Sequence, residues 1–279
     1  MKRLTLCLVL GALLLAGCKH DTKEFSTYTV SGERYYKFNF ENGVGPMDNF
    51  LGEIISYNLA WPDKGTVSPS AEHELMFVCF GDSTAADLNE AAYNWLEATS
   101  MASFEYLDDI LIEMVDEDEL DEKDLAYCKK ESSCQKDSQL ATFVVRNESF
   151  WPRAVHGIYS VNFLTVDLET GNAIHLDDLV SDTNLLCEAI AHAIQDLEVN
   201  METRECLFDE FRGAERMPMP QNFVIDSARN GITVLYGLYE ITPYACGIQS
   251  VVLPIFWLSK HVPLTPYAKR LFGPGCSID

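Results

Sequence analysis

The residues of this chain that could do chemistry are dispersed along it. Glu188, His192 and Asp196 are spaced four residues apart, so a helix would place all three on one face. Such a face is typical either of a metal or acid–base site or of surface pairing around one histidine, and we favour surface pairing. His156 and His175 lie in a strand-rich region, where we expect each to make structural hydrogen bonds rather than to catalyse.

Sequence patterns of catalysis and cofactor binding are absent. The chain has no G-x-S-x-G nucleophile turn, no phosphate-binding loop and no G-x-G-x-x-G fingerprint. It has no C-x-x-C pair and no two histidines at H-x-x-x-H spacing, so no metal site is predicted. Carboxylates are so numerous that a glycosidase pair cannot be chosen without geometry. We therefore predict no cofactor, no metal and no enzymatic activity.

The N-terminus has the pattern of an export signal. Two basic residues precede an apolar run from Leu4 to Leu15, which is too short to span a bilayer, and the run closes with Leu-Ala-Gly before Cys18. This junction resembles the bacterial lipoprotein signal, in which the cysteine is lipidated and the chain is cut before it. We predict a signal peptide over 1–17, lipidation at Cys18 and a tether over 18–25. An ordinary export signal that contains a cysteine is the alternative.

The predicted location is the cell envelope, with the chain anchored by lipid and facing the periplasm or the cell surface. Lys19 rather than Asp follows the cysteine, which favours the outer membrane if the host is Gram-negative. The formal net charge is −23, and it becomes −25 once Lys2 and Arg3 leave with the signal. Nucleic acid and anionic lipid surfaces are therefore not expected as partners, whereas a cationic partner fits. Acidity that only keeps an exported protein soluble is the alternative.

Seven cysteines remain once Cys7 and Cys18 are set aside. They are Cys79, Cys128, Cys134, Cys187, Cys206, Cys246 and Cys276. An exported protein can form disulfides, and the candidate pairs are Cys128–Cys134 and Cys187–Cys206. The number is odd, so at least one thiol stays free or pairs elsewhere.

The remaining sequence alternates between strand and helix patterns. Aromatic and β-branched residues predict two strands within 26–40 and further strands over 54–61 and 74–80. Apolar spacing from 85 to 115 predicts one long helix, followed by an acidic connector over 116–122. Downstream we predict strands over 140–145, 158–168, 222–226, 231–241 and 247–253, and helices over 181–197, 255–260 and 265–271, with a shorter helix ending near 211.

These elements predict an α+β fold of mostly antiparallel sheets packed with helices. We expect an N-terminal unit over 26–125, with the first strands and the long helix, and a C-terminal α+β unit over 126–279. Residues 236–241 and 248–253 should pair antiparallel, with the strand that ends at Asp167 in the same sheet, because only a covered sheet can bury apolar residues on both faces.

Two segments resemble a known family of extracytoplasmic domains. The first contains His156-Gly157, Asp167-Leu168-Glu169-Thr170-Gly171 and Ile174-His175-Leu176-Asp177-Asp178-Leu179, and the second is Tyr239-Glu240-Ile241-Thr242-Pro243-Tyr244-Ala245 followed by Gly247. This domain forms the C-terminal half of the extracellular part of RsiV-type anti-sigma factors, which sense lysozyme, and it also accompanies a peptidoglycan deacetylase. The similarity is specific over about residues 141–272, although Arg153, Ala154 and Val155 replace the glycines that usually precede the histidine.

The residues that carry this resemblance are predicted to act mainly in the fold. They are His156, Gly157, Asp167, Gly171, Leu176, Asp178, Leu179, Tyr239, Pro243, Tyr244 and Gly247. A histidine at the start of the long strand can fix it through hydrogen bonds, and a glycine beside it permits a close approach. A set of aromatic residues could line a binding surface or simply fill the core: Trp151, Tyr159, Tyr239, Tyr244 and Trp257.

The resemblance implies sensing or binding rather than chemistry. We expect a lipid-anchored, non-catalytic module that binds a cationic protein such as lysozyme or a cell-wall glycan such as peptidoglycan. One alternative is a hydrolase that acts on envelope glycans or peptides. The other is a purely structural envelope lipoprotein.

Overall fold

The computed structural model describes residues 24–40, 52–82, 84–102, 110–115, 125–150, 154–226 and 228–273. The predicted signal peptide, Cys18, most of the tether, the acidic connector, Trp151 and Cys276 lie outside these residues. Across the part of the chain that is described, no helix is long and apolar enough to cross a membrane.

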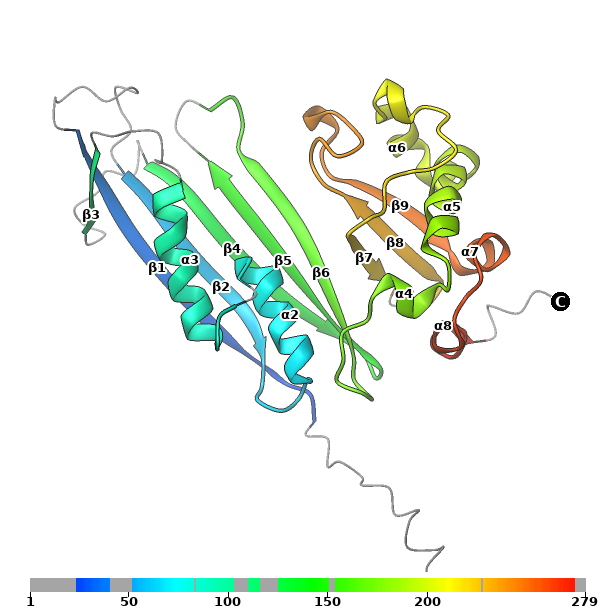
Figure 1. Cartoon of the computed structure of the whole chain (residues 1–279), viewed down its shortest axis with the longest axis horizontal. Helices are drawn as coiled ribbons and strands as arrows, with labels where there is room; N and C mark the ends of the chain where they lie inside the picture. Colours follow the sequence, from blue (N-terminus) through cyan, green and yellow to red (C-terminus); the bar gives the residue numbers. More distant parts are fainter. Residues whose placement is uncertain are drawn as a thin grey trace, which may run out of the picture.

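A six-stranded sheet forms the larger half of the fold (Figure 1). Its strands are β1 (Thr27–Phe40), β2 (Gly52–Pro62), β3 (Ile110–Val115), β4 (Leu125–Lys136), β5 (Leu140–Phe150) and β6 (Ile158–Asp167). Their order in space is β3-β1-β2-β4-β5-β6, with β2 and β4 parallel and all other neighbours antiparallel. A parallel pair needs a long connection, and here that connection contains two helices.

These two helices, α2 (Pro69–Phe80) and α3 (Leu88–Ala102), cover one face of the large sheet (Figure 1). Helix α2 begins after Ser68, whose hydroxyl accepts a hydrogen bond from the Ala71 amide. It ends at Gly81, whose φ of +74° suits a left-handed cap. Buried side chains of the helices and of alternate strand positions form a first hydrophobic core, which includes Ile55, Leu59, Trp61, Leu75 and Phe143.

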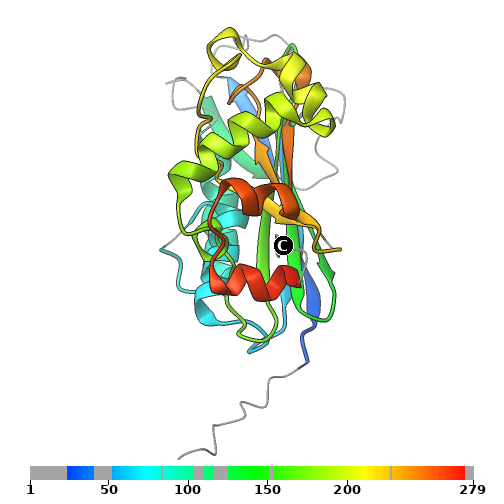
Figure 2. The same cartoon turned by 90° about the vertical axis from the view of Figure 1, so that its right-hand side faces the viewer.

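A three-stranded antiparallel sheet forms the smaller half, with β7 (Asn222–Ile225), β8 (Gly231–Tyr236) and β9 (Gln249–Pro254). Its helices are α4 (Leu176–Leu179), α5 (Thr183–Asp196), α6 (Met201–Cys206), α7 (Ile255–His261) and α8 (Pro266–Phe272). Three 3-10 turns lie among them: η3 (Glu198–Asn200), η4 (Asp209–Phe211) and η5 (Tyr244–Cys246). Figure 2 looks onto this half, with its helices in front of the strands. A second core includes Leu186, Ile190, Ile232, Val251 and Leu253.

The two sheets meet where β6 lies beside β7 (Figure 1). A side chain at the start of β7 contacts the backbone of β6 there. The Oδ1 atom of Asn222 accepts a hydrogen bond from the Phe163 amide at 3.0 Å, and its Nδ2 atom donates to the Val161 carbonyl. The side-chain amide of Asn222 therefore takes the place of a neighbouring strand along part of the edge of β6.

The α+β class and the predominance of antiparallel pairs are confirmed. The predicted strands 231–241 and 247–253 pair antiparallel only through Gly231–Tyr236 and Gln249–Pro254, and residues 237–241, which were expected to pair with 248–253, lie in the loop after β8. The strand that ends at Asp167 lies in the other sheet, so that part of the prediction is wrong. The boundary expected between residues 125 and 126 falls inside the large sheet, because β2 pairs with β4. The two hydrophobic cores divide instead at the end of β6, except that Leu140 of β5 belongs to the second core.

Three element predictions also need correction. Residues 74–80 belong to helix α2 rather than to a strand, because Ala71, Leu75 and Cys79 are buried at helical spacing. The helix predicted over 85–115 ends at Ala102 as α3, and Ile110–Val115 form β3, which pairs antiparallel with β1. Strand β4 was not predicted, because its polar residues obscure the alternation of apolar and polar side chains that indicates a strand.

Residues 27–40 form one strand rather than two. Gly32 lies opposite Tyr57 in the neighbouring strand, and a Cβ atom on Gly32 would stand 2.7 Å from the tyrosine ring. The glycine that suggests a turn therefore makes room for an aromatic ring within a continuous strand.

Neither predicted disulfide is present. Cys206 pairs with Cys246, and Cys187 is a buried free thiol. Cys128 and Cys134 are also free, because they lie six residues apart on the same extended strand, a span of about 20 Å that no disulfide bridges.

Candidate functional site

The two segments that carry the family resemblance meet in space. His156 lies just before β6, and the loop 239–247 connects β8 with β9. The His156 ring stacks on the Tyr244 ring, with centroids 3.5 Å apart and planes 16° from parallel. The rings of Tyr159 and Tyr239 lie 6.3 Å and 5.7 Å from that of Tyr244. We call His156, Tyr159, Tyr239 and Tyr244 the aromatic cluster.

Hydrogen bonds fix the centre of the aromatic cluster. The Gly157 carbonyl accepts one from Nδ1 of His156 at 3.0 Å and another from the Tyr244 hydroxyl at 2.7 Å. With the hydrogen on Nδ1, the Nε2 atom of His156 is an acceptor, and the Tyr239 hydroxyl lies 3.4 Å from it. Burial raises the pKa of the Tyr244 phenol, and Tyr159 and Tyr239 add to the rise, so Tyr244 remains a donor at neutral pH.

Backbone geometry at three positions supports this arrangement. A Cβ atom on Gly157 would stand 2.9 Å from the Ser149 carbonyl oxygen, so only glycine fits. Gly247 has a φ of +70° and packs against the Tyr159 hydroxyl. Tyr239 has a φ of +64°, which non-glycine residues rarely adopt and which costs about 1–3 kcal/mol. Strain of this kind clusters at binding and catalytic sites, where the fold holds one side chain in a required place.

The aromatic cluster is open to solvent on one side. Tyr239 is 58% exposed and Tyr159 is 38% exposed, and the neighbouring Val155 and Ile158 are exposed as well. A group of exposed apolar side chains in one place marks a surface that binds another molecule more often than isolated ones do.

A strongly acidic stretch is attached to this surface. We call residues 188–215 the acidic segment, because it contains eight exposed carboxylates and two arginines. The carboxylates are Glu188, Asp196, Glu198, Glu202, Glu205, Asp209, Glu210 and Glu215. The disulfide between Cys206 and Cys246 and a hydrogen bond from the Phe208 amide to the Ile241 carbonyl tie the segment to the loop 239–247. The aromatic cluster therefore has a fixed acidic neighbour.

The other residues of the family motif lie away from the cluster, in turns and cores. Asp167 accepts hydrogen bonds from the Glu169 and Thr170 amides and from the Tyr267 hydroxyl. Gly171 adopts a φ of +73° in the same turn. Leu176 and Leu179 are buried, and the Asp178 carboxylate accepts a hydrogen bond from the His175 amide. Pro243 begins η5.

The other chemical candidates do not converge. Glu188, His192 and Asp196 are all exposed on α5, and the described residues contain no group of three or more metal-ligating side chains. The Nε2 atom of His175 pairs with the Glu74 carboxylate at 3.3 Å. Trp257 is buried and stacks on His261, so it fills the core rather than lining the binding surface.

Sequence reasoning missed the link between the cluster and the acidic segment. The available signal was the position of Cys246, which lies inside the second resemblance segment and is the only cysteine there. It also missed Val155 and Ile158, because exposed apolar residues cannot be told from buried ones without the fold.

Comparison with known proteins shows the family of part of the chain. Residues 177–255 match the profile of a family described as a protein of unknown function, DUF3298. The chain carries a DUF3298 domain. The matched residues include Asp178 and the loop 239–247, whereas His156 lies before them.

Two solved structures of DUF3298 family proteins resemble this chain. A crystal structure of a DUF3298 family member from Bacteroides fragilis has 19% sequence identity and a TM-score of 0.55, and the alignment covers 88% of this chain and 95% of that one. It shows that the fold is shared. A DUF3298 family protein from Pseudomonas aeruginosa has 12% identity and a TM-score of 0.49, with 88% and 97% of the two chains covered. No curated protein matches the chain.

Proposed function

We propose that this protein is a lipid-anchored, non-catalytic binding module of the cell envelope, and that it holds a cationic protein such as lysozyme. The surface that would bind is the exposed side of the aromatic cluster together with the acidic segment. The observation that carries the proposal is the convergence of two distant segments on one exposed, hydrogen-bonded group of rings. The junction before Cys18 supports the anchor.

The surface has the chemistry of a protein-binding site. Exposed tyrosines supply large contact areas and are enriched among the residues that dominate binding energy. Here His156 and Tyr244 hold Tyr239 and Tyr159 in place before any partner arrives, which lowers the entropic cost of binding. Carboxylates around such a centre attract a basic protein, raise the association rate and make it depend on salt.

The hydrogen bonds of His156 support binding rather than catalysis. Its Nδ1 atom donates to the Gly157 carbonyl and its Nε2 atom lies 3.4 Å from the Tyr239 hydroxyl, so both ring nitrogens already face partners within the cluster. The histidine therefore acts within the cluster as a support for Tyr244 and Tyr239.

The direct test is binding of hen lysozyme to the full-length protein in detergent micelles, followed by biolayer interferometry at 50 and 300 mM NaCl. We expect binding that weakens at the higher salt, and at least tenfold weaker binding for Tyr239→Ala, as for a central tyrosine. Tyr93→Ala is the matched control, because Tyr93 is 57% exposed on α3 in the other half of the molecule. An absence of binding at both salt concentrations, or equal losses in the two variants, would rule out lysozyme at this surface.

A cell-wall glycan is the second candidate, because exposed rings such as those of Tyr159 and Tyr239 can also stack on sugar faces. Sedimentation with insoluble peptidoglycan distinguishes it from the first. A glycan that stacks on the rings should be lost in Tyr239→Ala and should respond little to salt, whereas a basic protein should respond to both.

A further inference from the structure

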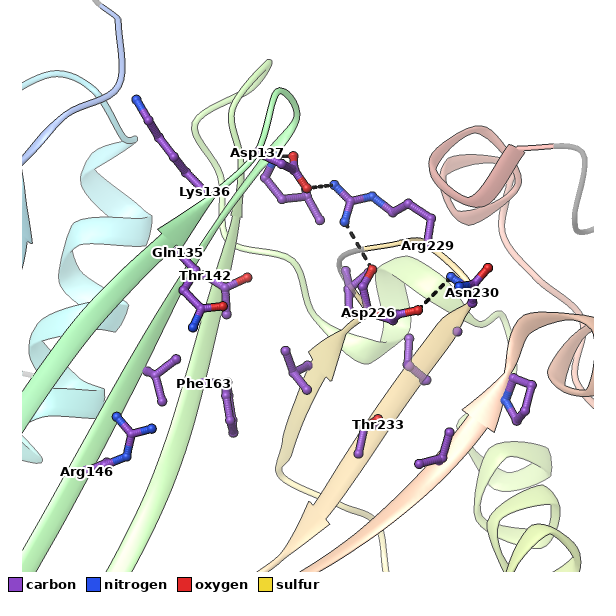
Figure 3. A pocket seen from close by; sticks show the side chains of 18 residues that line it. Gln135, Lys136, Asp137, Thr142, Arg146, Phe163, Asp226, Arg229, Asn230 and Thr233 are labelled. Carbon is purple, nitrogen blue, oxygen red and sulfur yellow. Dashed lines mark hydrogen bonds and ion pairs between the residues drawn. The ribbon is translucent and has the colours of Figure 1, made fainter. Parts of the chain in front are cut away.

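A cavity of about 570 Å³ lies between the two sheets and shares no residue with the aromatic cluster (Figure 3). Side chains alternate across a strand, so Thr142, Val144 and Arg146 of β5 point away from the helices that cover the large sheet. Thr233 of β8 faces them from the small sheet (Figure 3). The cavity therefore has one wall from each half of the protein.

The middle of the cavity is apolar. Its lining includes Val144, Phe163, Val224, Val252 and Pro254. Val144 is buried but belongs to neither hydrophobic core, and the other four are half-buried. These side chains thus form an apolar surface that neither core of the protein covers.

The two ends of the cavity differ in charge. At one end, Nη2 of Arg229 pairs with the Asp137 carboxylate at 2.6 Å and Nη1 donates to the Asp226 carbonyl at 3.3 Å, so the Arg229 charge is already balanced (Figure 3). Arg146 lies six residues along β5 from Leu140, about 20 Å away. Arg146 is exposed and has no hydrogen-bond or ion-pair partner among the described residues.

We propose that this cavity binds a single-chain amphipathic anion, with its acyl chain between the two sheets and its carboxylate or phosphate head at Arg146. The volume lies within the usual range for small-molecule sites, and such sites are mostly apolar with a few polar groups that fix orientation. A guanidinium matches the geometry of a carboxylate or a phosphate. Because the chain as a whole is strongly acidic, it repels an anion, and the positive charge of Arg146 offsets this repulsion at the cavity.

The test is photocrosslinking of the full-length protein in isolated membranes with a diazirine-bearing 12-carbon carboxylate, followed by peptide mapping. The matched probe is the corresponding 12-carbon alcohol, which has the same chain without the charge. We expect the carboxylate to label peptides within 140–167 and 222–254. Arg146→Gln should reduce this labelling at least tenfold at low probe concentration, because a charge-assisted hydrogen bond to the head is lost. Lys260→Gln on α7 removes a charge outside the cavity and should change nothing.

A second variant and a competition complete the test. Phe163→Ala should reduce labelling by the carboxylate while Arg146 is still present, and its thermal melting reports whether the fold survives. Competition by unlabelled laurate or by lauroyl lysophosphatidate supports the proposal. The stronger competitor shows whether the bound ligand has a carboxylate or a phosphate head. Equal labelling by the acid and the alcohol, unchanged labelling of Arg146→Gln, or labelling confined to other peptides would overturn the proposal, whatever the outcome of the lysozyme experiment.

Discussion

Removal of the Cys206–Cys246 disulfide should strongly destabilise the smaller half of the protein. The two cysteines are 40 residues apart, and a crosslink of that span lowers the entropy of the unfolded chain enough to stabilise the fold by about 4 kcal/mol at 25 °C. If the whole protein unfolds in one step, this loss of stability corresponds to a fall in melting temperature of about 8–16 °C. We therefore expect a large loss of stability in the double variant Cys206→Ser/Cys246→Ser.

The assay is urea unfolding of the wild type and the double variant, each with and without reductant, followed by far-ultraviolet circular dichroism. Reductant should lower the unfolding midpoint of the wild type to that of the double variant and should leave the variant unchanged. Cys134→Ser is the control, because Cys134 is a half-buried free thiol on β4 in the larger half. If the two halves unfold in separate steps, only the step that belongs to the smaller half should move.

Two results would refute this reasoning. One is an equal midpoint for the wild type and the double variant without reductant, which would mean that the crosslink adds nothing. The other is an equal loss in Cys134→Ser, which would trace the effect to the removal of a thiol rather than to the disulfide. Lysozyme binding should weaken in the double variant as well, because Cys246 follows Tyr244 in η5 and holds the aromatic cluster against α6.

Three further predictions concern single residues. His156→Ala should lower the free energy of unfolding by about 1–3 kcal/mol, because it leaves polar partners unsatisfied, and should weaken lysozyme binding of the folded fraction by less than Tyr239→Ala does, because His156 only supports the rings that bind; a wild-type melting temperature with abolished binding would contradict this. Burial raises the pKa of Glu53 to about 8, from its ordinary value of 4.5. Between these two pH values the folded protein holds a proton that the unfolded chain releases, so the free energy of unfolding should fall as the pH rises from 4.5 to about 8. In urea unfolding, the stability of Glu53→Gln should exceed that of the wild type at pH 9 by several kcal/mol but not at pH 4. Cys18→Ala should release the protein from membranes or leave an uncleaved precursor, and fractionation that shows normal processing with full retention would disprove it.

Much of the smaller half could be predicted from the sequence, because its elements have clear local signals. Asp182 marks the start of α5, and the apolar positions of β8 and β9 are continuous enough to indicate buried strands. The larger half was harder. Strand β3 continues the apolar spacing of α3, so the change from helix to strand depends on the open edge of β1 rather than on a local signal.

Most residues of the candidate site were named from the sequence, but mainly for roles in the fold and not as one binding site. His156, Tyr239, Tyr244 and Gly247 are named by the sequence pattern, yet only the fold brings them together. Disulfide partners depend in the same way on distant geometry, so Cys246 could not be chosen for Cys206 from spacing. The cavity could not be foreseen at all, because its walls come from two different sheets.

The amide of Asn222 has a consequence for self-association. Free edges of β-sheets recruit strands from other molecules, which leads to swapped dimers and fibrils. Along Val161 and Phe163, the edge of β6 is occupied by a single side chain that imitates the donor and acceptor of a peptide group. A change of Asn222 to Leu would keep the size of the residue but would leave that edge without a partner. We therefore expect the solubility of this protein under stress to depend on the neutral side chain of Asn222 at the joint between its halves, and not only on its large negative charge.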